Sequence, residues 1–230
     1  RVKFFGGKAA PSYQNAKLII KLANDVARVI NNDPAVRGLL KVVFMPNYNV
    51  SLAEIMVPAA DLSEQISTAG MEASGTGNMK FGLNGAITIG TLDGANVEMR
   101  SQVGEDNIVI FGLTAEEVLR WRGDGYVPRE VIDASPELSQ ALSAIASGVF
   151  SPDDRDRYKE LIAGIYERDW FMVAADFDSY AAAQRRVDDL WRDQDRWTAM
   201  AIRNSAHMGW FSSDRAIRQY ARDIWHVPTA

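Results

Sequence analysis

Glu72-Ala73-Ser74-Gly75-Thr76-Gly77-Asn78-Met79-Lys80 is the stretch around which the rest of the sequence is interpreted. A helix that begins at Ser74 or Thr76 with a side-chain cap leaves several backbone N–H groups of its first turn unpaired. Those N–H groups and the helix dipole favour an anion such as a phosphate. Lys80 follows Thr76 by four residues and shares its helix face. An anion site beside a partly buried lysine suits a cofactor with a phosphate at one end and an aldehyde at the other, because a lysine amine forms a Schiff base with an aldehyde.

Two common glycine motifs do not account for this turn. The third glycine of the dinucleotide motif G-x-G-x-x-G falls at Lys80, and the P-loop motif G-x-x-x-x-G-K-[ST] does not occur in the chain. On spacing alone, an ordinary turn that opens a helix remains the favoured interpretation, with Lys80 as a solvated side chain. Partial burial beside Met79 and Phe81 would instead make the amine a better nucleophile.

Strands and helices alternate on both sides of the stretch. Strands are predicted at 2–5, 39–45, 61–66, 86–92 and 107–111, and helices at 13–30, 50–57, 74–83 and 96–103. The segment 39–45 is apolar on both faces, as in a parallel sheet, and 2–5 is predicted to be buried. This alternation predicts a doubly wound, Rossmann-like parallel sheet, whose ligands would gather at the carboxyl ends of its strands.

The second half of the chain has a different pattern. Helical spacing is found at 115–121, 136–146 and 153–166, and again around 180–191, 197–208 and 217–224, where Ser212 or Ser213 is the expected cap of the last helix. We therefore expect one C-terminal, cofactor-bearing α/β domain over 1–230, in which 1–112 form the sheet with its helices and 113–230 form a mostly helical cover.

Composition excludes several classes of function. The net charge of −5 over 230 residues argues against a nucleic-acid partner, and no apolar run is long enough for a membrane span. Cysteine is absent, which removes disulfides and thiolate sites, and His207 and His226 lack metal-ligand spacing, so no metal is expected. A cytoplasmic location is the simplest interpretation. The first residues read as a strand already under way, so we expect a piece of a longer protein.

Three segments together resemble the glycogen phosphorylase family, of the bacterial glycogen type: residues 58–67, the stretch that ends at Lys80, and Gly94-Ala95-Asn96-Val97-Glu98. The resemblance extends over essentially the whole chain, through 6–11 near its start and 211–215 near its end. It implies a pyridoxal 5'-phosphate-dependent α-1,4-glucan phosphorylase, in which orthophosphate cuts the terminal bond of glycogen or maltodextrin and glucose 1-phosphate is released.

The same resemblance implies a role for individual residues. Lys80 would be the catalytic residue that carries the cofactor; the other cofactor-binding residues would be Gly75, Thr76 and Gly77, toward the phosphate, and Tyr48, near the pyridine ring. Sugar hydroxyls would be held by Glu72 and the backbone of Ala73, Ser74 and Gly75. Tyr13 resembles an aromatic residue that lines a surface pocket at the active-site entrance in some members.

The resemblance also implies what surrounds this chain. The chain would be the later portion of the second lobe of a two-lobed GT-B-type glycosyltransferase, which is expected to be a homodimer at full length. The N-terminal lobe, and a basic segment that grips the phosphates, would precede Arg1, and Asn49 stands where many members have an arginine. We expect the isolated chain to be inactive. The alternatives are a non-catalytic α/β module with at most weak cofactor binding and, from the alternation alone, a nicotinamide oxidoreductase, which the missing fingerprint disfavours.

Overall fold

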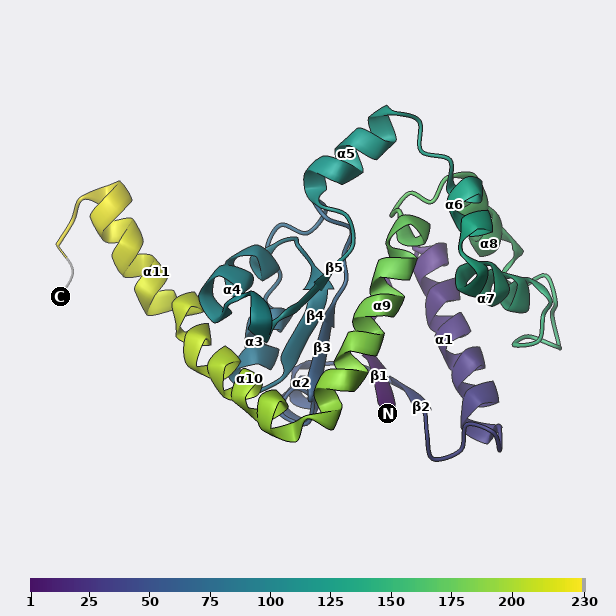
Figure 1. Ribbon diagram of the computed structural model, residues 1–230, viewed down its shortest axis with the longest axis horizontal. Coiled ribbons are helices and arrows are strands. Elements are labelled where there is room, and N and C mark those ends of the chain that lie inside the picture. Colours follow the sequence, from purple (N-terminus) through teal and green to yellow (C-terminus); the bar gives the residue numbers. More distant parts are fainter. Residues whose placement is uncertain (229–230) are drawn as a thin grey trace. The chain divides into compact units, whose positions relative to one another are not determined.

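The computed structural model describes residues 1–228, and its secondary-structure elements are shown in Figure 1. The strands are β1 Val2–Gly6, β2 Lys41–Met45, β3 Leu62–Gln65, β4 Ile87–Thr91 and β5 Val109–Phe111. The helices of the first half are α1 Gln14–Asn32, α2 Val50–Met56, α3 Gly77–Leu83 and α4 Ala95–Val103, followed by the 3-10 turn η1 Glu105–Asn107. The later helices are α5 Ala115–Gly123, α6 Pro128–Ala134, α7 Pro136–Ala146, α8 Lys159–Glu167, α9 Val173–Arg192, α10 Gln194–His207 and α11 Ser213–Tyr220, with the short turns η2 Met208–Phe211 and η3 Ala221–Trp225.

The chain folds into two compact units, and each unit is built from two separate segments of the sequence. Residues 1–53 and 127–174 form the first unit, and residues 54–126 and the described residues from 175 onward form the second. All strands of the described residues precede Gly112, and the elements after it are helical. The parallel α/β class expected from the alternation is confirmed.

The five strands form two parallel sheets, not one. In the first unit β1 pairs with β2, and in the second unit the order is β3-β4-β5. Within residues 1–228 no ladder joins the two sheets, so the expectation of a single doubly wound sheet is wrong for this structure. Alternation of strands with helices predicts parallel pairing, but it does not state which strands are neighbours.

The first unit has a sheet with little cover. Val2, Phe4 and Phe5 of β1 are about half exposed, at 51%, 58% and 45%, so the expectation that this strand is buried is also wrong. A strand pair has no central strand, and much of its surface stays open. On α1 the expected apolar face is half-buried except for Ile19, which is exposed, and the most buried side chain of the helix is that of Asp25, at 3%.

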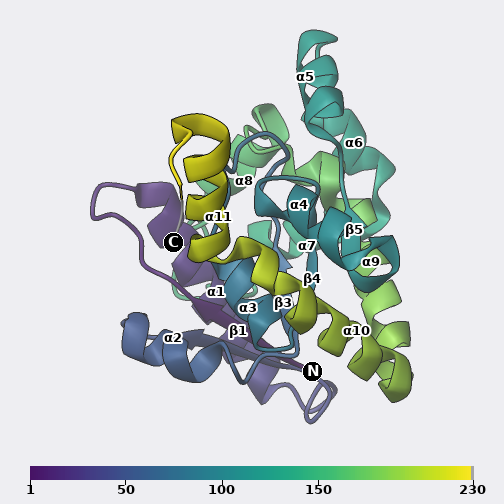
Figure 2. The same cartoon turned by 90° about the vertical axis from the view of Figure 1, so that its left-hand side faces the viewer.

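The second unit has the larger core. Every residue of the central strand β4 is buried. One face of its sheet packs against α9 and α10 through Ile87, Ile89, Val187 and Trp197, together with Val109, Phe111, Ala183, Leu190 and Met200. A separate cluster of Met99, Val103, Ile108 and Met208 joins α4 to η2. Figure 1 shows α4 and α9 on opposite sides of β3-β4-β5, and Figure 2 shows this unit from the side.

The helices depart from the sequence pattern in four places. The helix expected at 153–166 begins only at Lys159, because 152–158 form a series of turns, and α6 was not expected at all. For the segment 172–177 the sequence pattern favours neither a helix nor a strand, and α9 begins within it, at Val173. Ser212 is the residue before α11, but its side chain makes no capping hydrogen bond, so the expected cap is wrong. Across residues 1–228, no helix combines the length and apolar character needed to cross a bilayer.

Candidate functional site

The site lies where two neighbouring strands of the second unit end. β3 and β4 run parallel, and Gln65, the last residue of β3, is paired with Gly90 near the end of β4. The irregular segment 66–76 follows β3 and leads into α3, and the turn at Asp93-Gly94 follows β4 and leads into α4. Ligands of open α/β sheets bind outside such carboxyl ends.

Asp93 holds the segment after β3 in place. Its carboxylate accepts hydrogen bonds from the backbone N–H of Gly70, at 2.9 Å, from that of Glu72, also at 2.9 Å, and from Ser67 Oγ, at 3.2 Å. The Asp93 side chain is only 7% exposed, whereas Glu72 is exposed. The buried carboxylate of Asp93 therefore fixes the backbone of Glu72, whose own carboxylate is exposed.

Gly94 brings the two segments into direct contact. Its φ is +50°, and a Cβ built there would lie 2.6 Å from the carbonyl oxygen of Ser74, a separation that real Cβ atoms do not show. The next residue, Ala95, donates its backbone N–H to that same oxygen at 2.7 Å. A side chain at position 94 would force the Ser74 backbone away.

Two buried asparagines connect α3, α4 and the sheet. Asn78 and Asn96 are each 3% exposed, and Asn78 Nδ2 donates to Asn96 Oδ1 at 3.1 Å. Asn96 Nδ2 in turn donates to the carbonyl oxygens of Thr91, at 3.0 Å, and Gln65, at 3.3 Å. This network ties the start of α3 to the ends of both strands.

A small polar cavity of about 120 Å³ lies among these segments. Its lining comes from the end of β3, the segment after it, the turn after β4 and the starts of α3 and α4: Glu64, Gln65, Ile66, Ser67, Glu72, Ser74, Gly75, Asn78, Asp93 and Asn96. Carboxylates, amides and hydroxyls make up the polar groups of this lining, and no lysine or arginine is among the described residues that line it. Such acceptors and neutral donors suit the hydroxyl groups of a polyhydroxyl ligand better than an anion.

The structure brings together only some of the residues predicted from sequence. Glu72, Ser74 and Gly75 line the cavity, and Ala73, Thr76 and Gly77 lie beside them in the chain. The residue before α3 is Thr76, and it makes no side-chain capping hydrogen bond. Ser74 Oγ donates instead to the carbonyl oxygen of Gly75 at 3.0 Å. The expected side-chain cap of this helix is therefore wrong.

Lys80 is exposed, as the interpretation favoured on spacing alone has it, and the alternative of partial burial beside Met79 and Phe81 is wrong. α3 directs Asn78 and Gly82 inward, and Lys80, two residues after Asn78, is rotated by about 200° onto the other face of the helix. Tyr48 is half-buried and belongs to the first unit, where Asn49 Oδ1 accepts the backbone N–H of Leu52 at the start of α2. Asn49 therefore has a local structural role.

Sequence reasoning did not identify the side chains whose hydrogen bonds hold the cavity lining in place, those of Asp93, Asn78 and Asn96. The sequence pattern indicates only a turn at Asp93-Gly94, and it gives no separate role to the side chains of Asn78 and Asn96. An aspartate followed by glycine at a strand end is a signal for a turn, but it does not state which backbone the carboxylate will bind.

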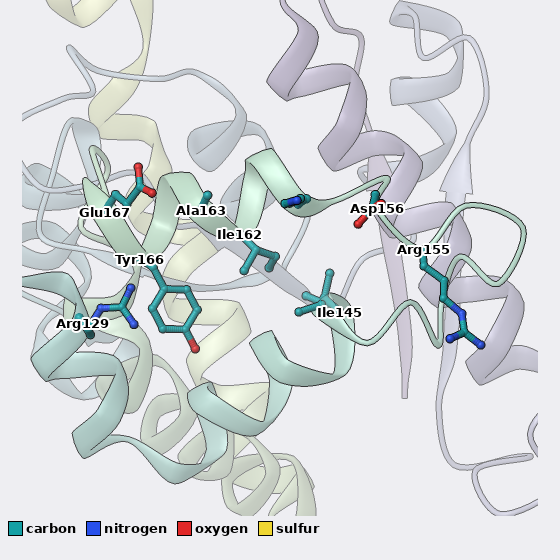
Figure 3. A pocket seen from close by; sticks show the side chains of 10 residues that line it. Arg129, Ile145, Arg155, Asp156, Ile162, Ala163, Tyr166 and Glu167 are labelled. Carbon is teal, nitrogen blue, oxygen red and sulfur yellow. The ribbon is translucent and has the colours of Figure 1, made fainter.

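The first unit contains a second, larger cavity of about 410 Å³ (Figure 3). Ile145, Ile162 and Tyr166 contribute to its lining, and the guanidinium carbon of Arg129 lies 5.1 Å from the ring centre of Tyr166. The other charged side chains of the lining have both signs: Arg155, Asp156, Lys159 and Glu167. All of these charged groups are exposed, and no residue of this lining was predicted to be functional.

Fold and site together define an α/β protein with a polar cavity at the carboxyl ends of parallel strands. The family model for carbohydrate phosphorylases matches residues 1–227, and the chain belongs to that family. It is 55% identical to the glycogen phosphorylase of Chlamydia pneumoniae over 226 residues, and 55% identical to the brain form of the human enzyme over 227 residues. These matches cover 98% and 99% of this chain but only 27% of each relative's length.

Proposed function

We propose that this chain is the cofactor-bearing C-terminal part of an α-1,4-glucan phosphorylase. The support is the family match over 1–227 and the 55% identity to proteins named glycogen phosphorylase. The complete protein would transfer the terminal glucose of glycogen or maltodextrin to orthophosphate and release glucose 1-phosphate. The chain would then be the later portion of the second lobe of a GT-B-type glycosyltransferase.

The cavity at Glu72 is the observation that carries the sugar-binding part of this proposal. Glu72 is exposed and acts as a hydrogen-bond acceptor when ionised, and Ser74 and Gly75 stand beside it in the lining. Glu64, which also lines the cavity, already accepts hydrogen bonds from Tyr180 Oη at 3.1 Å and Gln184 Nε2 at 2.9 Å. Glu72 is therefore the carboxylate that is available to a sugar hydroxyl.

The residues present also suit attachment of pyridoxal 5'-phosphate. Lys80 is exposed, and within residues 1–228 its amine makes no hydrogen bond or ion pair, so it is accessible to an aldehyde. At Gly77 an added Cβ would meet Gln65 Nε2 at 3.8 Å, an ordinary van der Waals contact, so the start of α3 is not tightly packed there. Lys80 would hold the aldehyde end, the backbone of Gly75 to Gly77 would face the phosphate, and Tyr48 would pack near the ring.

The carboxylates that line the cavity favour a neutral sugar over a phosphate. Glu64, Glu72 and Asp93 are all in its lining, and three carboxylates repel a phosphate dianion. We infer that the cavity takes neutral hydroxyls and that the phosphates lie outside it. When bound, the cofactor supplies a phosphate whose second pKa, about 6, allows proton exchange near neutral pH.

Labelling at Lys80 tests the cofactor proposal. The chain is incubated with pyridoxal 5'-phosphate, reduced with borohydride, digested and mapped. We expect one phosphopyridoxyl group, on Lys80, and its loss in Lys80→Arg, which keeps the charge but cannot form the linkage. The exposed Lys159 serves as the matched control, since Lys159→Arg should leave the label unchanged. Labelling spread evenly over surface lysines would contradict the proposal.

A chimera tests the activity of the complete protein. Residues 1–227 replace the matching segment of the Chlamydia pneumoniae glycogen phosphorylase, and glucose 1-phosphate release from glycogen is measured. We expect activity in the chimera and at least about 100-fold less with Glu72→Ala, because misplaced substrate is costly to the rate. A folded chimera without activity would favour the alternative of a non-catalytic module with at most weak cofactor binding.

Three further expectations stay predictions. These are the homodimer of the full-length protein, the cytoplasmic location, and the division of the chain into a sheet part over 1–112 and a helical cover over 113–230.

A further inference from the structure

The segment that carries Glu72 is held by hydrogen bonds to residues far from it in the chain. Residues 66–76 contain no helix or strand, so no regular ladder of backbone hydrogen bonds holds them. Their attachments to the turn after β4 include three hydrogen bonds to Asp93 and the bond from Ala95 N–H to the carbonyl of Ser74. Thr91 adds one more, from its Oγ1 to the carbonyl of Ser67 at 2.6 Å.

Asp93 is the residue at which most of these attachments meet. Both of its carboxylate oxygens are used: Oδ1 accepts from Gly70, and Oδ2 accepts from Glu72 and Ser67. Hydrogen bonds to an ionised acceptor are stronger than those to a neutral one. The side chain is buried, so it is shielded from competing water.

We propose that Asp93 is a positioning residue for sugar recognition: its carboxylate fixes the backbone of Glu72 and so aims the exposed Glu72 side chain at the sugar. Gly94 and Ala95 fix the same segment two residues further on, at Ser74. This inference rests on the proposed function for its sugar, but the fixing of the backbone by Asp93 stands on the contacts alone.

Asparagine cannot replace this carboxylate, although it has the same shape. An amide has one acceptor oxygen and one NH₂ group. In Asp93→Asn, the NH₂ would face either the N–H of Gly70 or the N–H of Glu72, and two donors would then oppose each other. The substitution therefore breaks one anchor of the segment with almost no change in volume.

Hydrogen exchange in the isolated chain tests the anchoring without any activity. In the unmutated chain the amides of Gly70 and Glu72 should exchange at least about tenfold more slowly than that of Ala73, whose N–H has no partner within residues 1–228. In Asp93→Asn, at least one of the two should approach the rate of Ala73. Asp106→Asn, at an exposed position of the same unit, is the control and should change neither. Equal exchange of Gly70, Glu72 and Ala73 in the unmutated chain would overturn the proposal.

The chimera tests the consequence for sugar recognition. In Asp93→Asn the KM for glucose 1-phosphate, measured in the direction of glucan synthesis, should rise about 10- to 100-fold. Borohydride-trapped labelling of Lys80 should stay unchanged, because α3 is held separately through the bond from Ser205 Oγ to the carbonyl of Gly82. Asp106→Asn should behave as the parent chimera does.

The outcomes separate this proposal from the proposed function. An unchanged KM in Asp93→Asn, in an active chimera, would overturn the positioning role and leave the phosphorylase proposal intact. Slow exchange at Gly70 and Glu72 in the chain, together with an inactive parent chimera, would support the anchoring and count against the phosphorylase proposal. A raised KM together with the loss of Lys80 labelling in Asp93→Asn would show a general structural defect and would overturn the specific role of Asp93.

Discussion

At the scale of single residues, Asp25 on α1 is a buried charge of the first unit, with an exposure of 3%. Its carboxylate accepts hydrogen bonds from Lys21 Nζ at 2.6 Å, Tyr158 Oη at 2.6 Å and Arg157 Nη1 at 2.9 Å. Arg157 also pairs with Asp153 at 2.5 Å. The network connects α1 to the turns before α8, which are 132 residues away in the chain. Nothing in the sequence pattern of α1 indicated this role.

Asp25→Asn should destabilise the chain by about 3 kcal/mol, because it leaves the guanidinium of Arg157 without its buried partner. Urea unfolding followed by circular dichroism measures the loss. Asp133→Asn, at an exposed position on α6 in the same unit, is the matched control and should change stability by less than about 0.5 kcal/mol. Equal stability of the two variants would show that the network contributes little.

The same network should make the free energy of unfolding depend on pH in both the acid and the alkaline range. Burial alone would raise the pKa of Asp25, but the hydrogen bonds from Lys21, Tyr158 and Arg157 outweigh it, so the pKa lies below its ordinary 3.8. The stability gained from this carboxylate is thus present above about pH 4 and is lost as pH falls further. Burial, then the hydrogen bond to Asp25, raises the pKa of Tyr158 well above 10.0, so its contribution is full below pH 10 and is lost as pH rises through the folded-state pKa.

Unfolding free energies at a series of pH values check both limbs. Asp25→Asn should flatten the acid limb, and Tyr158→Phe should flatten the alkaline limb. Acid and alkaline limbs that are identical in the parent and in both variants would contradict this assignment.

At the scale of elements, two helix starts offer a matched comparison. Thr114 caps α5 with a full capping box: its Oγ1 accepts from Glu117 N–H at 3.3 Å, and Glu117 Oε2 accepts from Thr114 N–H at 2.8 Å. Ser212 stands at the same place before α11 without such a bond. Thr114→Ala should therefore cost about 1 kcal/mol, and Ser212→Ala close to nothing, in thermal unfolding. A larger cost for Ser212→Ala would refute the difference between the two ends.

The central strand β4 depends on Gly90. A Cβ there would lie 2.5 Å from the carbonyl oxygen of Gln65 on β3 and 2.7 Å from Asn96 Nδ2. Gly90→Ala should cost at least about 2 kcal/mol, because backbone atoms must move to admit the methyl group. Gly123→Ala, in α5, meets nothing within 4 Å and should be neutral or stabilising by up to about 1 kcal/mol. Chemical unfolding of both variants measures the contrast, and equal effects would contradict it.

At the scale of the whole molecule, the chain spans 27% of the length of its glycogen phosphorylase relatives. Phosphoryl and glycosyl transfer depend on charges placed around the reacting atoms. Among the described residues, the lining of the cavity at Glu72 contains no lysine or arginine. We expect the isolated 230-residue chain to release no measurable glucose 1-phosphate from glycogen, whereas the chimera does. Release by the purified chain above that of a Lys80→Arg control would disprove this expectation.

The sequence by itself determined the class of fold, the family and most of the elements. Local spacing is enough for these: β2, β3, β4 and α7 lie where apolar runs, alternation and helical periodicity predicted them, and the motif around Glu72–Lys80 is long enough to identify a family. Only the tertiary structure decided how the Glu72–Lys80 stretch is held. Asp93, Asn96 and Gln65 lie up to 31 residues from the groups they bind, and Lys80 faces away from the buried side of α3. Hydrogen bonds between distant segments depend on which strands become neighbours, and periodicity within a segment carries no information about that choice.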